Sequence, residues 1–331
     1  MPYAALDCLR DSIHDINLMS PTSYTIAGVR QHLSAQSSQS PGTAVAQDVP
    51  IVLALANDIY LRKYAKLMAP KAPSGRLERL PFLAALSAAN ASIAGWDGGW
   101  SLERRLDDRD YLLQRDGFFL RASAAEIEPD PGTAGAQARY SVNVGKEQLA
   151  SGSGWYVAFG NVAMRSDTSE ILTRLYWNVT PHAAARLVRA LTQHLNDFSV
   201  AFKMKLPAAP DAYDRVDTAV LYLAKCDYLR GKALFSSIHR GLSGLRSAVP
   251  VFTKSIAPGL GVAEDPGNGL SFGQHRCLIV ARALWRAFMD GEDSPTARMS
   301  FLEQEFCLHG LDCAAPHLGP NSDDVYERFA A

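Results

Sequence analysis

The chain lacks the features that mark several common classes of protein. Its formal net charge is −1 over 331 residues, so it has no basic excess of the kind that binds nucleic acid or anionic membrane surfaces. It has no apolar run long enough to span a bilayer, and its first residues do not resemble a signal peptide. We therefore expect a soluble, cytoplasmic protein that binds neither nucleic acid nor a membrane.

Cysteine is also scarce. The five cysteines are scattered and odd in number, which argues against a disulfide scaffold and favours a reducing compartment. One C-terminal stretch holds potential metal ligands, namely Cys307, His309, Cys313 and His317. Their spacing matches none of the common zinc patterns. We predict no metal site in this stretch.

The phosphate-binding loops of common nucleotide enzymes are missing. The glycine pair that begins at Gly259 lacks the third glycine of a dinucleotide fingerprint. Neither a G-x-x-x-x-G-K-[ST] loop nor an H-R-D catalytic loop occurs anywhere in the chain. The sequence therefore argues against a kinase or a Rossmann enzyme, and we expect no cofactor.

The patterns that are present predict an α+β protein. The chain is long enough, and at 47% hydrophobic content apolar enough, to bury a large core. Its second half reads strand, helix, strand, strand, helix, strand, helix, which predicts a mixed or antiparallel sheet flanked by helices. We divide the chain into a helical and β region, 1–165, and an α+β region, 166–331. One continuous domain fits the same pattern, and the polar segment Ala35–Asp48 is predicted to be a loop.

The stretch Phe198–Leu223 combines strand patterns with clustered cations. Alternation places Lys203 and Lys205 on one face of the first strand, and the apolar residues between them on the other. Arg215 lies in the run that leads into the second strand. These cations suit a bound anion, although lysines also occur on the exposed face of edge strands.

A second candidate anion site is the start of a predicted helix at Ser271. Ser271 and Gln274 match a capping box, and glycines precede the helix. A helix N-terminus attracts anions, and Arg276 lies within the first turn. The same residues also fit a simple helix cap whose arginine forms an outward salt bridge.

Several segments together resemble the HopA-type effector family. They include LYWNVTP, FKMKLP, YDRVDTAVLYLAK, VPVFTKSIAPGLGVAEDPGNGLSFGQHR and GLDCAAPHL. That family includes a type III secreted effector of plant-pathogenic bacteria. It also includes stand-alone lyases of class V lanthipeptide and thioamitide biosynthesis, which act on ribosomal peptides. A more distant resemblance is to phosphothreonine lyases of enteric pathogens, whose α+β fold we expect here.

The resemblance to these lyases implies roles for four cations. Lys203 corresponds to the catalytic base, because Arg215 follows it at the interval that the lyases show. Lys205, on the same face, is the competing choice. Arg215 and Arg276 correspond to the two arginines that bind the substrate phosphate.

The same resemblance extends to a strand of the VLYLAK segment. Tyr222 and Lys225 are similar to the tyrosine and lysine of the corresponding strand in the lyases, with Tyr222 as a catalytic donor and Lys225 near the phosphate. Lys254 is a further candidate for substrate contact, or simply the end of a strand.

One position departs from the pattern of the lyases. Their general-acid histidine is absent here, since the corresponding strand reads Tyr176-Trp177-Asn178. Asn178 is a candidate hydrogen-bond donor to the substrate. His182 and His275 are candidate proton donors, although neither matches the motif.

The resemblance implies elimination of phosphate from phosphoserine or phosphothreonine of a precursor peptide, which leaves dehydroalanine or dehydrobutyrine. A separate kinase would phosphorylate the peptide and form a dehydratase complex with this chain. Guanidinium groups would stabilise the departing phosphate, so the reaction requires no metal. The alternative is a non-catalytic, effector-like protein that binds a phosphoprotein.

Overall fold

The chain folds as an α+β protein, as predicted. The computed structural model describes residues 10, 13–33, 48–66, 76–115, 118–133, 135, 138–149, 154–164, 170–292 and 294–330. Of the polar segment Ala35–Asp48, only Asp48 is among these residues, and the boundary drawn between 165 and 166 also lies outside them.

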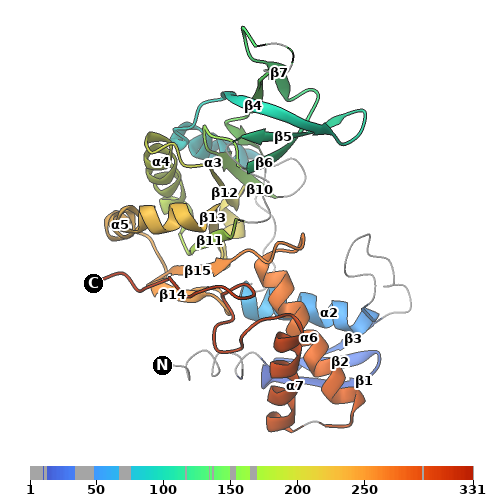
Figure 1. Ribbon diagram of the computed structural model, residues 1–331. Coiled ribbons are helices and arrows are strands. Elements are labelled where there is room, and N and C mark those ends of the chain that lie inside the picture. The colour runs from blue at the N-terminus through green and yellow to red at the C-terminus, as the bar shows by residue number, and fades with distance from the viewer. Residues whose placement is uncertain are drawn as a thin grey trace.

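A seven-stranded sheet occupies the middle of the molecule (Figure 1). Its strand order is β14-β15-β11-β13-β12-β10-β9, and each pairing in it is antiparallel. This resolves the choice between a mixed and an antiparallel sheet. The strands are β9 (Glu147–Gln148), β10 (Trp155–Phe159), β11 (Leu172–Trp177), β12 (Phe202–Pro207), β13 (Ala219–Ala224), β14 (Lys254–Ala257) and β15 (Leu260–Glu264).

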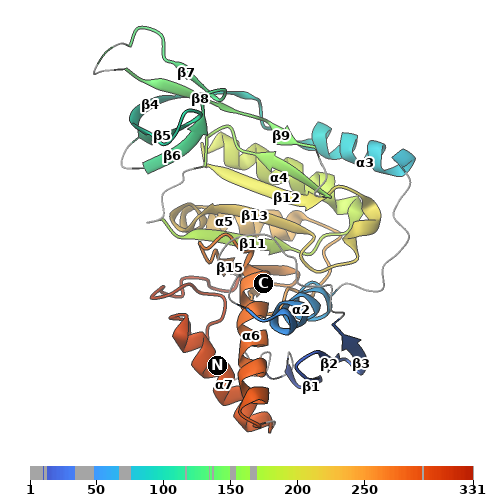
Figure 2. The same cartoon turned by 90° about the vertical axis from the view of Figure 1, so that its right-hand side faces the viewer.

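Helices α4 and α5 lie behind this sheet in Figure 2, and α6 meets only part of the opposite face. Helices α4 and α5 bury one face, where Trp177 and Met204 lie in their core. Helix α6 packs on the other face, where Tyr176 and Tyr222 share its core. Within the described residues, no helix combines the length and apolar character needed to cross a membrane. The helices are α2 (Pro50–Ile59), α3 (Arg76–Ala89), α4 (Pro181–Asp197), α5 (Lys225–Gly241), α6 (Phe272–Met289) and α7 (Pro295–Leu308).

Two smaller antiparallel sheets flank the central one (Figures 1 and 2). A three-stranded sheet packs with α2, α6 and α7 around one core, so residues near both ends of the chain fold together. A five-stranded sheet has a separate small core around Trp100. The strands are β1 (Ile16–Ser20), β2 (Ser23–Ile26), β3 (Val29–His32), β4 (Gly95–Arg105), β5 (Asp110–Arg115), β6 (Phe118–Ser123), β7 (Ile127–Pro129) and β8 (Tyr140–Val144).

The predicted alternation in β12 is confirmed. Phe202, Met204 and Leu206 are at most 1% exposed in the core beneath α4 and α5, whereas Lys203 and Lys205 are half-buried on the opposite face. Each buried apolar side chain contributes about 1.5–3 kcal/mol, and a slip of one residue would place both lysines in that core. The apolar residues therefore fix the face on which the lysines lie.

The predicted capping box at the start of α6 is also confirmed. Ser271 accepts a hydrogen bond from the Gln274 backbone N–H, and the Gln274 side chain accepts one from the Ser271 N–H. In the same turn, a Cβ on Gly273 would lie 2.4 Å from a ring carbon of Tyr64. Glycine at this position therefore allows the Tyr64 ring, from the N-terminal part of the chain, to pack directly against this helix.

Candidate active site

Four cations gather around two aromatic rings on the sheet face that α6 partly covers. In the strand register, Tyr222 of β13 lies opposite Lys203 of β12 on one side and opposite Arg174 of β11 on the other. Lys205 follows on the same face. The group that we call the cationic face consists of Arg174, Lys203, Lys205, Arg215, Tyr222 and Trp155.

The cations stack on the two rings in sequence across the face. The Cζ atom of Arg174 lies 5.0 Å from the Tyr222 ring centroid, and the Lys203 Nζ atom lies 4.9 Å from it. The Lys205 Nζ atom lies between the rings, 5.7 Å from Tyr222 and 4.8 Å from Trp155. The Arg215 Cζ atom is also 4.8 Å from Trp155. Such contacts hold cations in place at about 0.5–2 kcal/mol each.

The two arginines of this face are each held by a carboxylate. Arg215 donates from Nη2 to Asp217 Oδ2 at 2.8 Å and also from Nε to Oδ1 of the same carboxylate. Arg174 donates from Nε to Asp265 Oδ2 at 2.7 Å. Burial is the largest single effect and lowers the pKa of Arg215, but the charge of Asp217 and the interactions with Asp217 and Tyr60 together outweigh it, so the pKa lies above its ordinary value. The guanidinium is therefore charged and fixed in orientation.

The two lysines have no such partner. Neither Lys203 nor Lys205 forms a hydrogen bond or an ion pair in the described structure, and their contacts are the aromatic rings. The Nη1 atom of Arg215 likewise forms no hydrogen bond within the described residues. The four cations carry two more charges than the two carboxylates, which bind only the arginines. This arrangement suits a dianion such as a phosphate monoester.

Two other predicted phosphate ligands lie elsewhere. Lys225 donates to Glu264 at 2.8 Å and to the Ser322 hydroxyl at 2.7 Å, and Lys254 pairs with Asp324 at 2.6 Å. These contacts hold the segment that follows α7. The tail cluster, as we name this second group, comprises Lys225, Lys254, His275, Arg276, Glu264, Asp324 and the backbone of residues 316–323.

Arg276 belongs to the tail cluster and is 1% exposed. It donates from Nε to the Pro316 carbonyl and from Nη2 to the Leu318 carbonyl, both at 2.7 Å. Its Nη1 atom donates to His275 Nδ1 at 2.6 Å. The structure therefore uses Arg276 to hold the chain after α7, and all three of its nitrogens are engaged.

The candidate proton donors are not brought to the cationic face. His182 is exposed on α4, which covers the opposite face of the sheet. His275 is buried beside Arg276, and burial together with that charge lowers its pKa to about 3. It is therefore neutral at pH 7. Asn178 is 2% exposed and donates to the Ala248 carbonyl at 2.9 Å, so it holds a loop.

Three residues near the lysines were missed by reasoning from sequence. Arg174 could have been found, because strand alternation places it on the same face as Tyr176 and hence in register with Tyr222. Trp155 begins β10, whose pairing with β12 is not encoded locally. Tyr60, from the N-terminal region, meets Arg215 across 155 residues of sequence, and no local pattern predicts that contact.

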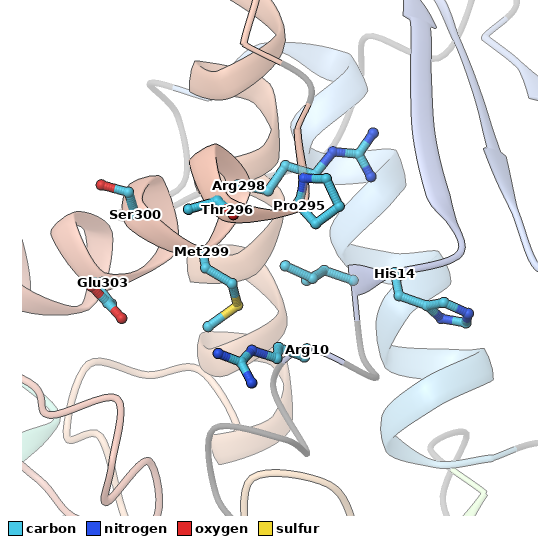
Figure 3. A pocket seen from close by; sticks show the side chains of 9 residues that line it. Arg10, His14, Pro295, Thr296, Arg298, Met299, Ser300 and Glu303 are labelled. Carbon is cyan, nitrogen blue, oxygen red and sulfur yellow. The ribbon is translucent and has the colours of Figure 1, made fainter. Parts of the chain in front are cut away.

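Two cavities of the described structure are lined by residues other than those of the cationic face. A cavity of about 550 Å³ lies between α7 and the segment near Arg10 and His14, and none of its lining residues belongs to the central sheet (Figure 3). A second, of about 790 Å³, opens at one end of that sheet and includes Asp265, which binds Arg174. Among the described residues, no three His, Cys, Asp or Glu side chains form a group that could hold a metal ion.

The comparison with protein families identifies the chain. A model of the HopA1 effector protein family matches residues 147–318, just over half of its length. The chain belongs to the HopA1 effector protein family. The matched residues include every member of the cationic face, and the family resemblance inferred from the sequence is confirmed.

One solved structure of an effector protein shares the fold. An effector protein from Pseudomonas syringae pv. tomato strain DC3000 is 17% identical, with a TM-score of 0.50, and the match covers 80% of this chain and 90% of that one. An effector protein from Pseudomonas syringae pv. syringae strain 61 is 16% identical, with a TM-score of 0.42 and coverage of 84% and 92%. The comparison with curated proteins found no match. At 17% identity the first of these similarities concerns the fold alone.

Proposed function

We propose that this member of the HopA1 effector protein family eliminates phosphate from phosphoserine or phosphothreonine in a precursor peptide. The product would be dehydroalanine or dehydrobutyrine, as in lanthipeptide- or thioamitide-like maturation of ribosomal peptides. The observation that carries the proposal is the pair of lysines without a carboxylate partner, held beside two fixed arginines. A structural ion pair would leave no such excess of positive charge.

The reaction needs a base that removes the weakly acidic Cα proton. An amine serves as that base in its unprotonated form. Lys203 is our preferred base, because it lies directly opposite Tyr222 and shares that ring with Arg174. Lys205, between the two rings, is the alternative base and otherwise a phosphate contact.

The phosphate would bind at the Arg215 end of the face. Asp217 orients the guanidinium and leaves Nη1 available to donate to a phosphate oxygen. Arg174 adds positive charge at the other end. The hydroxyl of Tyr222 would donate to the substrate carbonyl, whose charge grows as the Cα proton leaves.

A separate kinase is part of this proposal, because the sequence has none of the nucleotide-binding loops discussed above. The kinase would supply the phosphopeptide and associate with this chain as a dehydratase. The substrate of the chain itself is then the phosphorylated peptide, and not the free serine or threonine.

The test is incubation of the purified chain with synthetic phosphoserine and phosphothreonine peptides. We expect release of inorganic phosphate and a peptide that has lost the mass of phosphoric acid. Lys203→Ala should lower the rate by about 10²–10⁴, and Lys205→Ala by less. If Lys205→Ala has the larger effect on the rate at saturating peptide, the assignment of the base is reversed.

The second candidate is a non-catalytic protein that binds phosphorylated partners. It is favoured by the buried Tyr176, which stands where the lyases that the sequence resembles have a histidine. Under this alternative, the peptides would bind to the cationic face, and their phosphate would be retained. Binding without any phosphate release by the unaltered chain would select this alternative over the lyase.

A further inference from the structure

The N-terminal region contributes a tyrosine to the cationic face. After α2, the chain continues as a π-helical turn, Tyr60–Tyr64, in which the Ala65 N–H donates to the Tyr60 carbonyl at 2.8 Å. Such wide turns are rare and occur frequently at functional sites. The Tyr60 and Tyr64 rings stack with centroids 5.2 Å apart. The turn therefore presents two aromatic rings side by side.

This turn is attached to the segment that carries Arg215. The Val216 N–H donates to the Ala65 carbonyl at 3.0 Å, and Arg215 Nη2 donates to the Tyr60 hydroxyl oxygen at 3.2 Å. Tyr64 packs against the Tyr176 ring of the central sheet, with centroids 6.4 Å apart. Contacts on both sides thus fix the Tyr60 hydroxyl beside the guanidinium proposed to bind phosphate.

The proton of this hydroxyl is available for donation. Because Arg215 already donates to the oxygen, the phenol O–H points elsewhere, and it has no acceptor among the described residues. Burial, and to a lesser degree the charge of Asp217, raises the pKa of Tyr60 to about 12. The group is therefore protonated at neutral pH and only partly covered, so that a ligand at Arg215 Nη1 would lie next to an intact phenol.

We propose that Tyr60 is the general acid of the elimination and takes the place of the absent histidine. The inference rests on the proposed lyase function. The lysine removes the Cα proton, the C–H electron pair forms the Cα=Cβ bond, and the Cβ–O bond breaks with its electrons on the phosphate oxygen. Tyr60 gives its proton to that oxygen, which yields HPO₄²⁻. Arg215 stabilises the resulting phenolate of Tyr60. The proton that the lysine took from Cα then passes through solvent to this phenolate, which restores both groups.

The general acid is needed only when the phosphate group of the substrate carries no proton. A phosphate monoester has a second pKa of about 6, so at about pH 8 roughly one molecule in a hundred still carries a proton on its phosphate. Without an acid, the remainder would have to release a phosphate trianion. At about pH 5.5 most of the substrate is a monoanion and leaves as HPO₄²⁻ unaided.

The experiment compares the chain with Tyr60→Phe across this pH range, on the synthetic phosphopeptides, at saturating peptide. We expect the ratio of the two rates to be about 100 at pH 8 and to fall toward one at pH 5.5. Any pH dependence that the two proteins share cancels in the ratio of their rates. A ratio close to one throughout, or a large ratio that does not change with pH, would overturn the assignment.

A matched control separates chemistry from folding. Tyr24→Phe removes another buried phenol of the N-terminal region, which donates to Asp58 of α2 at 3.0 Å. We expect its rate ratio to be independent of pH and close to one. In a misfolded Tyr60→Phe chain the rate of phosphate release would not recover at low pH, and the circular dichroism spectrum would differ from that of the unaltered chain. If the unaltered chain releases no phosphate, the lyase proposal itself fails. If the unaltered chain and Tyr60→Phe release phosphate equally fast at every pH, only the assignment of Tyr60 as the acid fails.

Discussion

The cationic face and the tail cluster use the same residue types for different ends. In the tail cluster, Lys225 and Lys254 each have a carboxylate within 2.8 Å. On the cationic face, Lys203 and Lys205 have none among the described residues, and rings take that place. A lysine whose charge is compensated holds the fold together. An uncompensated pair is free to take up an anion, so the counter-charge distinguishes the two regions.

The largest effect on stability is expected from Lys225→Met. Its partner Glu264 is buried, and although burial raises the pKa of Glu264, hydrogen bonds led by that from Lys225 keep it below its ordinary value. Removing the lysine leaves a buried carboxylate without its cation, at about 3–5 kcal/mol. Urea unfolding should report this loss, with the rate of phosphate release per folded molecule unchanged. A loss below about 1 kcal/mol would mean that the pair does not anchor the tail.

Arg215→Lys tests the other region. A lysine cannot keep both the two-point contact with Asp217 and a donor to the phosphate, so we expect phosphopeptide kcat/KM to fall by about 10- to 100-fold. The free energy of unfolding should change much less than in Lys225→Met. Arg240→Lys, on α5 at the opposite face, is the matched control and should leave kcat/KM unaltered. If Arg215→Lys and Arg240→Lys had equal kcat/KM, this result would contradict a phosphate site at Arg215.

The tail cluster should respond to acid through His275. Its pKa is about 3 in the folded chain and 6.5 ordinarily, so between these values the unfolded chain binds the proton and the folded chain does not. The free energy of unfolding should therefore fall as pH falls from 6.5 toward 3, by up to about 1.4 kcal/mol per pH unit. Urea titrations at several pH values measure the slope. His275→Gln should flatten it, and an unchanged slope would exclude His275 as its source.

The smallest effect is expected from Lys254→Ala. Lys254 and Asp324 are each about one-third exposed, so the pair contributes at most about 1 kcal/mol. Thermal unfolding should shift slightly, and phosphate release should keep its rate. A strong loss of activity would place Lys254 in the substrate site after all and would remove the distinction between the two regions.

Local sequence patterns predicted the parts of the site that depend on a single element. Alternation in β12 placed Lys203 and Lys205 correctly, because buried neighbours dictate the face of a strand. The capping box of α6 was predicted from Ser271 and Gln274 for the same reason, since cap geometry is local.

Residues whose role depends on distant contacts could not be predicted in this way. Lys225 meets Ser322 across 97 residues, and Arg276 meets Leu318 across 42, so nothing near either residue in the sequence indicates that a tail engages it. Tyr60 reaches Arg215 through the packing of the N-terminal region on the sheet. Charge and motif alone therefore grouped Lys203, Lys205 and Arg215 with residues that the structure places in the tail cluster.

The central claim is that the uncompensated lysines perform the elimination. The most direct measurement is phosphate release from a phosphothreonine peptide by the chain with Lys203→Ala and Lys205→Ala together, beside Lys254→Ala as a control strand lysine. We predict that the double variant folds, as judged by circular dichroism, yet releases phosphate at least about 10³-fold more slowly, while the control keeps its activity. Phosphate release by the double variant at the rate of the unaltered chain would contradict the account.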